Sequence, residues 1–153
     1  LAGSAMAQMS VPVPGVPLHL VDQARTLLVQ TAPNLLGQTI GRGECTDYVE
    51  AMLRGLGYPC DPANYVWGRP LPGIQWGCVM QYFNARWEDP ANPANYFETA
   101  TQHTLIIHSH AGNGVWNVLE QNANGQRFVT AGSYNFGWRM TRGRVIFYQP
   151  GFM

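Results

Sequence analysis

The stretch of this chain that decides its fold is HTLIIHSHAGNGVWNVLEQNANG, residues 103–125. Runs rich in Val, Ile and Leu meet here at Asn113-Gly114, and a second Asn-Gly pair follows at Asn124-Gly125. Asn-Gly is the strongest short signal for a two-residue hairpin turn, because both residues tolerate positive φ. The stretch therefore predicts consecutive antiparallel hairpins.

The rest of the chain separates into a helical half and a strand half. Apolar residues recur at helical spacing in 19–31, where Leu20, Ala24, Leu27 and Leu28 share a face, and again in 45–56. Later segments are rich in Val, Ile, Phe, Tyr and Thr, with turn residues between them. We expect strands at 79–86, 103–110, 114–121, 126–134 and 143–149.

Helices first and strands later indicate an α+β domain. We expect one domain over residues 19–153, with N-terminal helices packed on an antiparallel β-sheet of about five or six strands. Residues 1–18 are expected to be a tag-like or extended segment. Ala5-Met6-Ala7 would fit a signal-peptide cleavage site, but the charged and apolar parts of a signal peptide are absent, which favours an expression-vector scar.

Composition excludes some classes of protein. The 153 residues carry no net charge, so the sequence lacks the basic footprint of a nucleic-acid binder. No apolar run approaches the roughly 18 residues of a membrane span. Three cysteines leave the redox state open, because Cys60 and Cys78 would pair in an oxidising compartment, whereas all three would be thiols in a reducing one.

Cys45 stands where a glycine-rich loop, residues 41–44, enters the second predicted helix. Backbone N–H groups at a helix N-terminus are unpaired and the helix dipole is positive there, which favours a thiolate. The same N–H groups can hold the oxyanion of an acyl transfer. The alternative is that Cys45 is an inert, buried residue that packs as a small hydrophobe.

A thiolate nucleophile needs a base, and His103 is the histidine that we favour because the apolar strand after it would fix its backbone. In the predicted hairpin, His103 lies beside Glu120 and Asn122, which have the same parity and face the same side. One of them would orient the imidazole, or the pair is only a polar contact at a sheet end. His108 and His110 share a face, but no further zinc ligand is evident at strand spacing.

These motifs together resemble a known family. Gly-x-Gly-x-Cys-Thr-x-Tyr-Val at 41–49, His-Thr-x-Ile-Ile at 103–107 and Val-Leu-Glu-Gln-Asn at 118–122 are similar to the CHAP amidase/endopeptidases, relatives of the papain-like NlpC/P60 peptidases. The resemblance runs from about residue 41 to 150 and implies a papain-like fold. It also implies roles for four residues: Cys45 as nucleophile, His103 as base, Glu120 as the group that orients it, and Asn122 as the residue that completes the site.

Two departures from the family pattern bear on the substrate. Gly77-Cys78 stands where many relatives have Gly-Asp, and an insertion at 87–101 leads into His103 and could form a wall of the cleft. The residues expected to contact substrate are Gly43, Glu44, Trp76 and Gln102.

The expected function is hydrolysis of amide bonds in peptidoglycan, as an N-acetylmuramoyl-L-alanine amidase or an endopeptidase. We expect a monomer that needs no metal or other cofactor and that is secreted, periplasmic or associated with the cell wall. Two alternatives stay open. One is a papain-like effector or toxin that cleaves, deamidates or acylates host proteins, and the other is an inactive cell-wall binding module with exposed aromatic side chains.

Overall fold

The first helix, α2, begins directly after Pro17 and covers Leu18–Thr31. We describe the protein from a computed structural model, over residues 12–99 and 101–153. Two 3-10 turns and one more helix follow: η1 (Ala32–Leu35), α3 (Cys45–Gly55) and η2 (Pro62–Asn64). The strands are β1 (Arg69–Leu71), β2 (Val79–Asp89), β3 (Asn92–Glu98), β4 (Gln102–Gly112), β5 (Val115–Ala123), β6 (Gln126–Asn135) and β7 (Arg139–Gln149).

These strands join one antiparallel sheet in the order β1-β7-β2-β4-β5-β6, with β3 paired to β2. The predicted hairpins are confirmed, because β4 pairs with β5 and β5 pairs with β6. Both residues of each connecting Asn-Gly pair have positive φ. Turns of this kind match the right-handed twist of the strands that they join. The start of β4 is thereby brought next to the end of β5.

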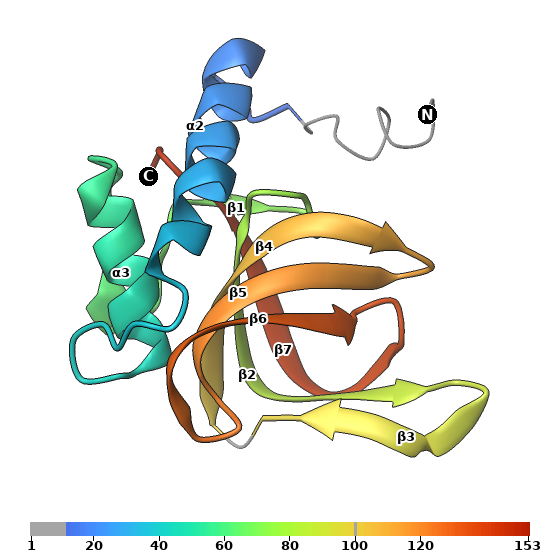
Figure 1. The fold of residues 1–153 in the computed structure, drawn as a ribbon. Coiled ribbons are helices and arrows are strands. Elements are labelled where there is room, and N and C mark those ends of the chain that lie inside the picture. Colours follow the sequence, from blue (N-terminus) through green and yellow to red (C-terminus); the bar gives the residue numbers. More distant parts are fainter. Residues whose placement is uncertain (1–11, 100) are drawn as a thin grey trace.

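Alternation along the strands gives the sheet two apolar faces, each with its own core. The helix-facing core joins sheet residues such as Val79 and Ile106 to helix residues such as Leu28 and Leu53. The strand core, on the other face, contains Met80 and its neighbours and draws its residues from strands and the loops beside them. The sheet is strongly curved, and both helices lie on one side of it (Figure 1).

The expected fold class, N-terminal helices packed on a papain-like sheet of five or six strands, is wrong. Seven strands in the described residues form the body of the molecule, and only two short helices accompany them. Two strands were not predicted: the three-residue β1, and β3 within the predicted insertion 87–101. This insertion contains Pro90 and Pro93, but β3 is an exposed strand, and proline is tolerated in edge strands.

The predicted positions of both helices are confirmed, but one apolar face is not. In α2 the buried residues are Val21, Ala24, Arg25 and Leu28, whereas Leu20 and Leu27 are exposed. Arg25 Nε donates to Gln149 Oε1 across this face. Helical periodicity missed the true face because a buried arginine replaces an apolar residue in it.

Three smaller expectations concern the chain ends, the thiols and membranes. Of the predicted tag-like or extended segment, residues 1–11 lie outside the described residues, and Val13 beyond them is buried. Cys60 and Cys78 are both free thiols and are not joined in a disulfide. Among the described residues, no helix has both the length and the apolar character to cross a membrane.

Candidate active site

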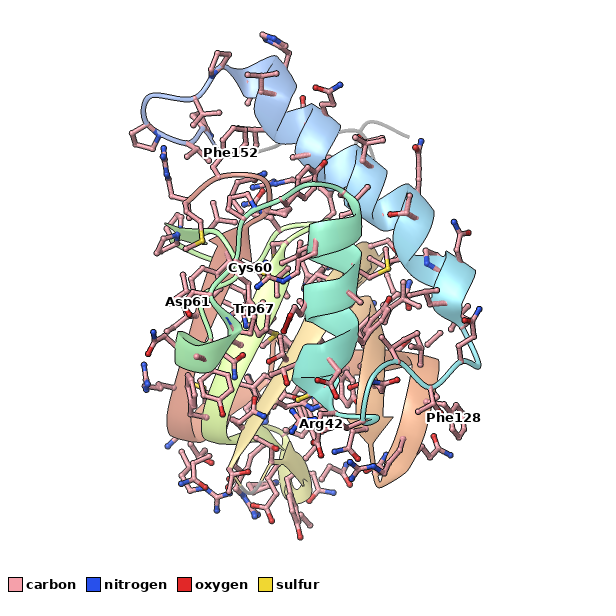
Figure 2. The ribbon with its side chains drawn as sticks, turned by 90° about the vertical axis from the view of Figure 1, so that its left-hand side faces the viewer. Arg42, Cys60, Asp61, Trp67, Phe128 and Phe152 are labelled. Atoms are coloured by element: carbon pink, nitrogen blue, oxygen red, sulfur yellow. The ribbon has the colours of Figure 1, made fainter. Side chains whose placement is uncertain are left out.

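The candidate site begins at the N-terminus of α3, where Cys45 is the first helical residue. The N-cap residue Glu44 has an extended backbone, and its N–H donates to Asp47 Oδ2 at 3.3 Å. The same oxygen accepts the N–H of Arg42 at 2.9 Å. The label of Arg42 marks this end of the helix in Figure 2. A carboxylate in the first turn satisfies unpaired N–H groups and complements the helix dipole. These bonds fix the backbone that carries the buried Cys45 thiol.

Strand β4 brings the His103 ring to this thiol, close enough for each side chain to shift the pKa of the other. The ring Nε2 faces Glu120 Oε1 on β5 at 2.8 Å, which leaves Nδ1 for the sulfur. Glu120 is 2% exposed, and its Oε2 accepts the Tyr134 hydroxyl from β6 at 2.6 Å. Cys45, His103 and Glu120 thus place a thiol, an imidazole and a buried carboxylate in sequence, the three kinds of group that a nucleophile, its base and an orienting residue require.

The surroundings of Cys45 and His103 shift their pKa values in opposite directions. Burial would raise the pKa of Cys45, but the hydrogen bond and the charge of His103, aided by the Thr104 backbone and the Gln102 side chain, lower it below the usual value. Burial would lower the pKa of His103, but hydrogen bonds and charges from Cys45 and Glu120 raise it to about 9. These shifts favour a thiolate–imidazolium pair, in which the sulfur is reactive.

Gln102, predicted to contact substrate, lies beside the Cys45 thiol. Its Nε2 is 3.4 Å from Cys45 Sγ, and its Oε1 is 3.8 Å from the same atom. The Gln102 Oε1 atom already accepts a hydrogen bond from Gln81 Nε2 at 3.0 Å, so we assign the nearer Nε2 as the donor to sulfur. The sulfur is therefore approached by His103, by the Gln102 amide and by the Thr104 backbone.

Asn122, predicted to complete the site beside Glu120, contacts a different partner. Its Nδ2 donates to Glu44 Oε2 at 3.4 Å, and Arg127 Nη2 donates to Glu44 Oε1 at 2.6 Å. Asn122 has a φ of +63° and lies where the β5–β6 register shifts, so the alternation on which the prediction relied is broken. The structure therefore groups Asn122 with the predicted substrate residue Glu44.

Gly43 was predicted to let a substrate backbone come close, and the structure gives a second reason for a glycine there. Its φ is +83°, and a Cβ at this position would lie 2.8 Å from Arg127 Cβ. The left-handed backbone and the neighbouring arginine both disfavour any larger residue. Gly43 thus lets the loop before Cys45 approach β6.

Trp76 and the two later histidines of β4, His108 and His110, lie away from Cys45. Trp76 precedes Gly77, whose N–H donates to Ile107 O, four residues along β4 from His103. His110 stacks on Trp116, with ring centroids 4.4 Å apart, and His108 Nδ1 lies 2.9 Å from Ser109 Oγ. Within residues 12–99 and 101–153, no cluster of three or more His, Cys, Asp or Glu side chains is arranged to hold a metal ion.

Several polar residues that support the site were not predicted from the sequence, among them Gln81, Gln121 and Tyr134. Gln121 is fully buried, accepts the Ile40 N–H at 2.8 Å and donates to Glu44 O at 2.7 Å. It therefore fastens the loop before Cys45 to β5. A signal was available, because glutamines within apolar strand runs need buried hydrogen-bond partners.

Comparison with known proteins shows the fold of this chain and no more. No family and no curated protein matches it. Two solved structures are similar to it at 15% sequence identity: the crystal structure of Ly7917, and that of Ly7917 with the hydrolyzing product of MDP. Their TM-scores are 0.53 and 0.52, and the matches cover 84% and 82% of this chain. The chain spans 63% of the length of Ly7917.

Proposed function

We propose that this protein is a cysteine hydrolase that cleaves amide bonds. The observation that carries the proposal is the connection of Cys45, at a helix N-terminus, to His103 and through it to the buried Glu120. Each of the three groups has the neighbour that its part in acyl transfer requires. The intact set also argues against an inactive binding module on the same scaffold.

In the proposed reaction, the Cys45 thiolate attacks the amide carbonyl carbon and a C–S bond forms, while the carbonyl electron pair moves onto oxygen. When that pair returns, the C–N bond breaks and His103 gives its Nδ1 proton to the leaving amine. The thioester that results is attacked by a water whose proton passes to His103. Release of the acid restores the thiolate and the imidazolium.

We further propose peptidoglycan stem peptides as substrate, cleaved either at the muramoyl–L-alanine bond or within the peptide. Two observations support this choice: the sequence resemblance to CHAP amidase/endopeptidases, and a fold like that of Ly7917, one structure of which holds the hydrolyzing product of MDP. MDP abbreviates muramyl dipeptide, a peptidoglycan fragment. Such a substrate would place the protein at the cell wall, in the periplasm or outside the cell.

The decisive experiment compares Cys45→Ala with Cys60→Ala on purified peptidoglycan and on muramyl dipeptide. We expect the first variant to lose at least about a thousandfold in the rate at which new amino groups appear, because the nucleophile is gone. Cys60→Ala is the matched control, since it makes the same cysteine-to-alanine change at a free thiol that lies beyond the C-terminal end of α3. Undiminished hydrolysis by Cys45→Ala would reject the proposal, and mass spectrometry of the fragments would identify the bond that is cut.

A further inference from the structure

Gln102, which precedes His103 in β4, belongs to a series of hydrogen-bonded side chains on the opposite face of the sheet from His103. Adjacent strand residues point to opposite faces. His103 therefore shares the face of Tyr82, whose ring centroid is 5.5 Å from its own, while Gln102 contacts Gln81 of the helix-facing side. Both Gln102 and His103, the first two residues of β4, nevertheless approach the Cys45 sulfur.

This hydrogen-bonded series begins at Trp67, which is fully buried in the helix-facing core beside α3 (Figure 2). The Trp67 indole N–H donates to Gln81 Oε1 at 2.9 Å. The Thr104 hydroxyl donates to the same oxygen. Gln81 Nε2 donates to Gln102 Oε1 at 3.0 Å, and Gln102 Nε2 lies 3.4 Å from Cys45 Sγ. Trp67, Gln81 and Thr104 are each 0% exposed, so water does not compete for the two bonds to Gln81 Oε1.

Trp67, the first residue of the series, sets which atom of each hydrogen bond donates and which accepts. An indole N–H can only donate, so the Gln81 atom that faces Trp67 must be the oxygen. The Gln81 amide nitrogen then faces Gln102, which in turn must present its own oxygen to it. A flip of either amide would bring two donors together in a buried site, which is costly. The NH₂ group of Gln102 is therefore held toward the sulfur.

We propose that the Gln102 amide is the side-chain donor that stabilises first the Cys45 thiolate and then the oxyanion, and that Gln81 and Trp67 position it. Only the second part of this proposal, stabilisation of the oxyanion, rests on the proposed hydrolase function. When the C–S bond forms, negative charge moves from sulfur to an oxygen bonded to the same carbon, within reach of a donor that already faces the sulfur. Gln102 transfers no proton, and the Cys45 backbone N–H at the helix N-terminus is the second donor.

The test uses Gln102→Ala and Gln81→Glu. The first removes the donor. The second keeps the oxygen that accepts from Trp67 and Thr104 but removes the N–H that holds Gln102 Oε1. We expect Gln102→Ala to lower kcat by roughly a hundredfold, the loss typical of one oxyanion donor, with little change in KM. Gln81→Glu is expected to lower kcat by about tenfold, because it misorients the donor without removing it.

The matched control is Gln149→Met, which removes another fully buried amide from the sheet without touching Cys45. We expect this variant to lower the melting temperature but to keep kcat. A kcat within twofold of the parent for Gln102→Ala, or equal losses for Gln81→Glu and Gln149→Met at matched melting temperature, would overturn the inference.

A second readout needs no substrate and separates this inference from the proposed function. The rate of Cys45 alkylation by iodoacetamide is followed against pH in the parent, Gln102→Ala and Gln81→Glu. We expect the pH midpoint of alkylation to rise in both variants, because the thiolate loses a donor. If the parent hydrolyses no amide yet these midpoints rise, the function fails and the donor arrangement stands. If the parent hydrolyses peptidoglycan and neither the midpoints nor kcat change, the donor arrangement fails by itself.

Discussion

Two arms of polar side chains reach the Cys45 sulfur from opposite faces of the sheet, and they differ in charge. On the strand-core face, the arm is His103, Glu120 and Tyr134, and it contains a buried carboxylate. On the helix-facing side, the arm is Gln102, Gln81 and Trp67, and every member is neutral. One arm can move protons, whereas the other can only orient a dipole.

The two arms end in the same way, in an aromatic donor that cannot easily ionise. Burial and the charge of Glu120 raise the pKa of Tyr134, which keeps its hydroxyl protonated and donating to the carboxylate. The indole of Trp67 has no acid–base chemistry in water at all. In each arm, a donor held at the far end sets the direction of the hydrogen bonds that follow it.

The largest difference between the arms should appear when the residue nearest the sulfur is removed. His103→Ala takes away both the base and the proton donor, and we expect kcat to fall by about 10⁴-fold or more. Gln102→Ala, in contrast, leaves the proton chemistry intact. Steady-state hydrolysis of peptidoglycan fragments by both variants checks the contrast, which would be lost if the two variants were equally impaired.

The next effect concerns the charge within the first arm. Glu120→Gln keeps the shape of the side chain but removes the charge that raises the pKa of His103. We expect a loss of roughly a hundred- to a thousandfold in kcat, since the ring is misoriented and its protonated form is less stable. The pKa of His103, measured by NMR titration of its ring protons, should fall. An unchanged His103 pKa in this variant would show that Glu120 does not support the imidazolium.

The parent protein should lose activity in alkaline solution. In the proposed reaction His103 must be protonated to serve the leaving amine, and its pKa is raised to about 9. The rate should therefore be retained below that pH and fall by up to about tenfold per pH unit above it. On the acid side, the lowered pKa of Cys45 shifts the loss of activity to lower pH, because the thiolate persists to lower pH. A rate profile from pH 5 to 10.5 measures both limbs, and a rate that kept rising beyond pH 10 would contradict the assignment.

The smallest effect is expected at the end of the charged arm. Tyr134→Phe removes only the hydroxyl that donates to Glu120 Oε2. A hydrogen bond worth roughly 1 kcal/mol corresponds to about a fivefold loss in rate. Phe136 lies in the same aromatic cluster, with its ring centroid 5.6 Å from that of Tyr134, so Phe136→Leu serves as a control for changes in packing alone. A larger loss from the control than from Tyr134→Phe would assign the effect to packing.

Much of the site could be predicted from the sequence, because local rules place its main members. A glycine-rich loop before a helix predicts the position of Cys45, and Asn-Gly turns predict the hairpin that brings Glu120 to His103. The direction of Asn122 could not be predicted, since its positive φ depends on how β5 and β6 adjust their register. Of the second arm only Gln102 was predicted, because Trp67 and Gln81 are 14 residues apart and meet only through packing.

Local sequence patterns were enough to predict both helices, the two Asn-Gly hairpins, and the thiol and imidazole that we propose as nucleophile and base. These follow from short-range physics: turn geometry, strand alternation and the electrostatics of a helix N-terminus. Tertiary packing sets the curvature of the sheet around the strand core and turns the Gln102 NH₂ group toward Cys45. The reason is that sheet curvature and buried amide orientation depend on partners distant in the chain, which local sequence patterns do not encode.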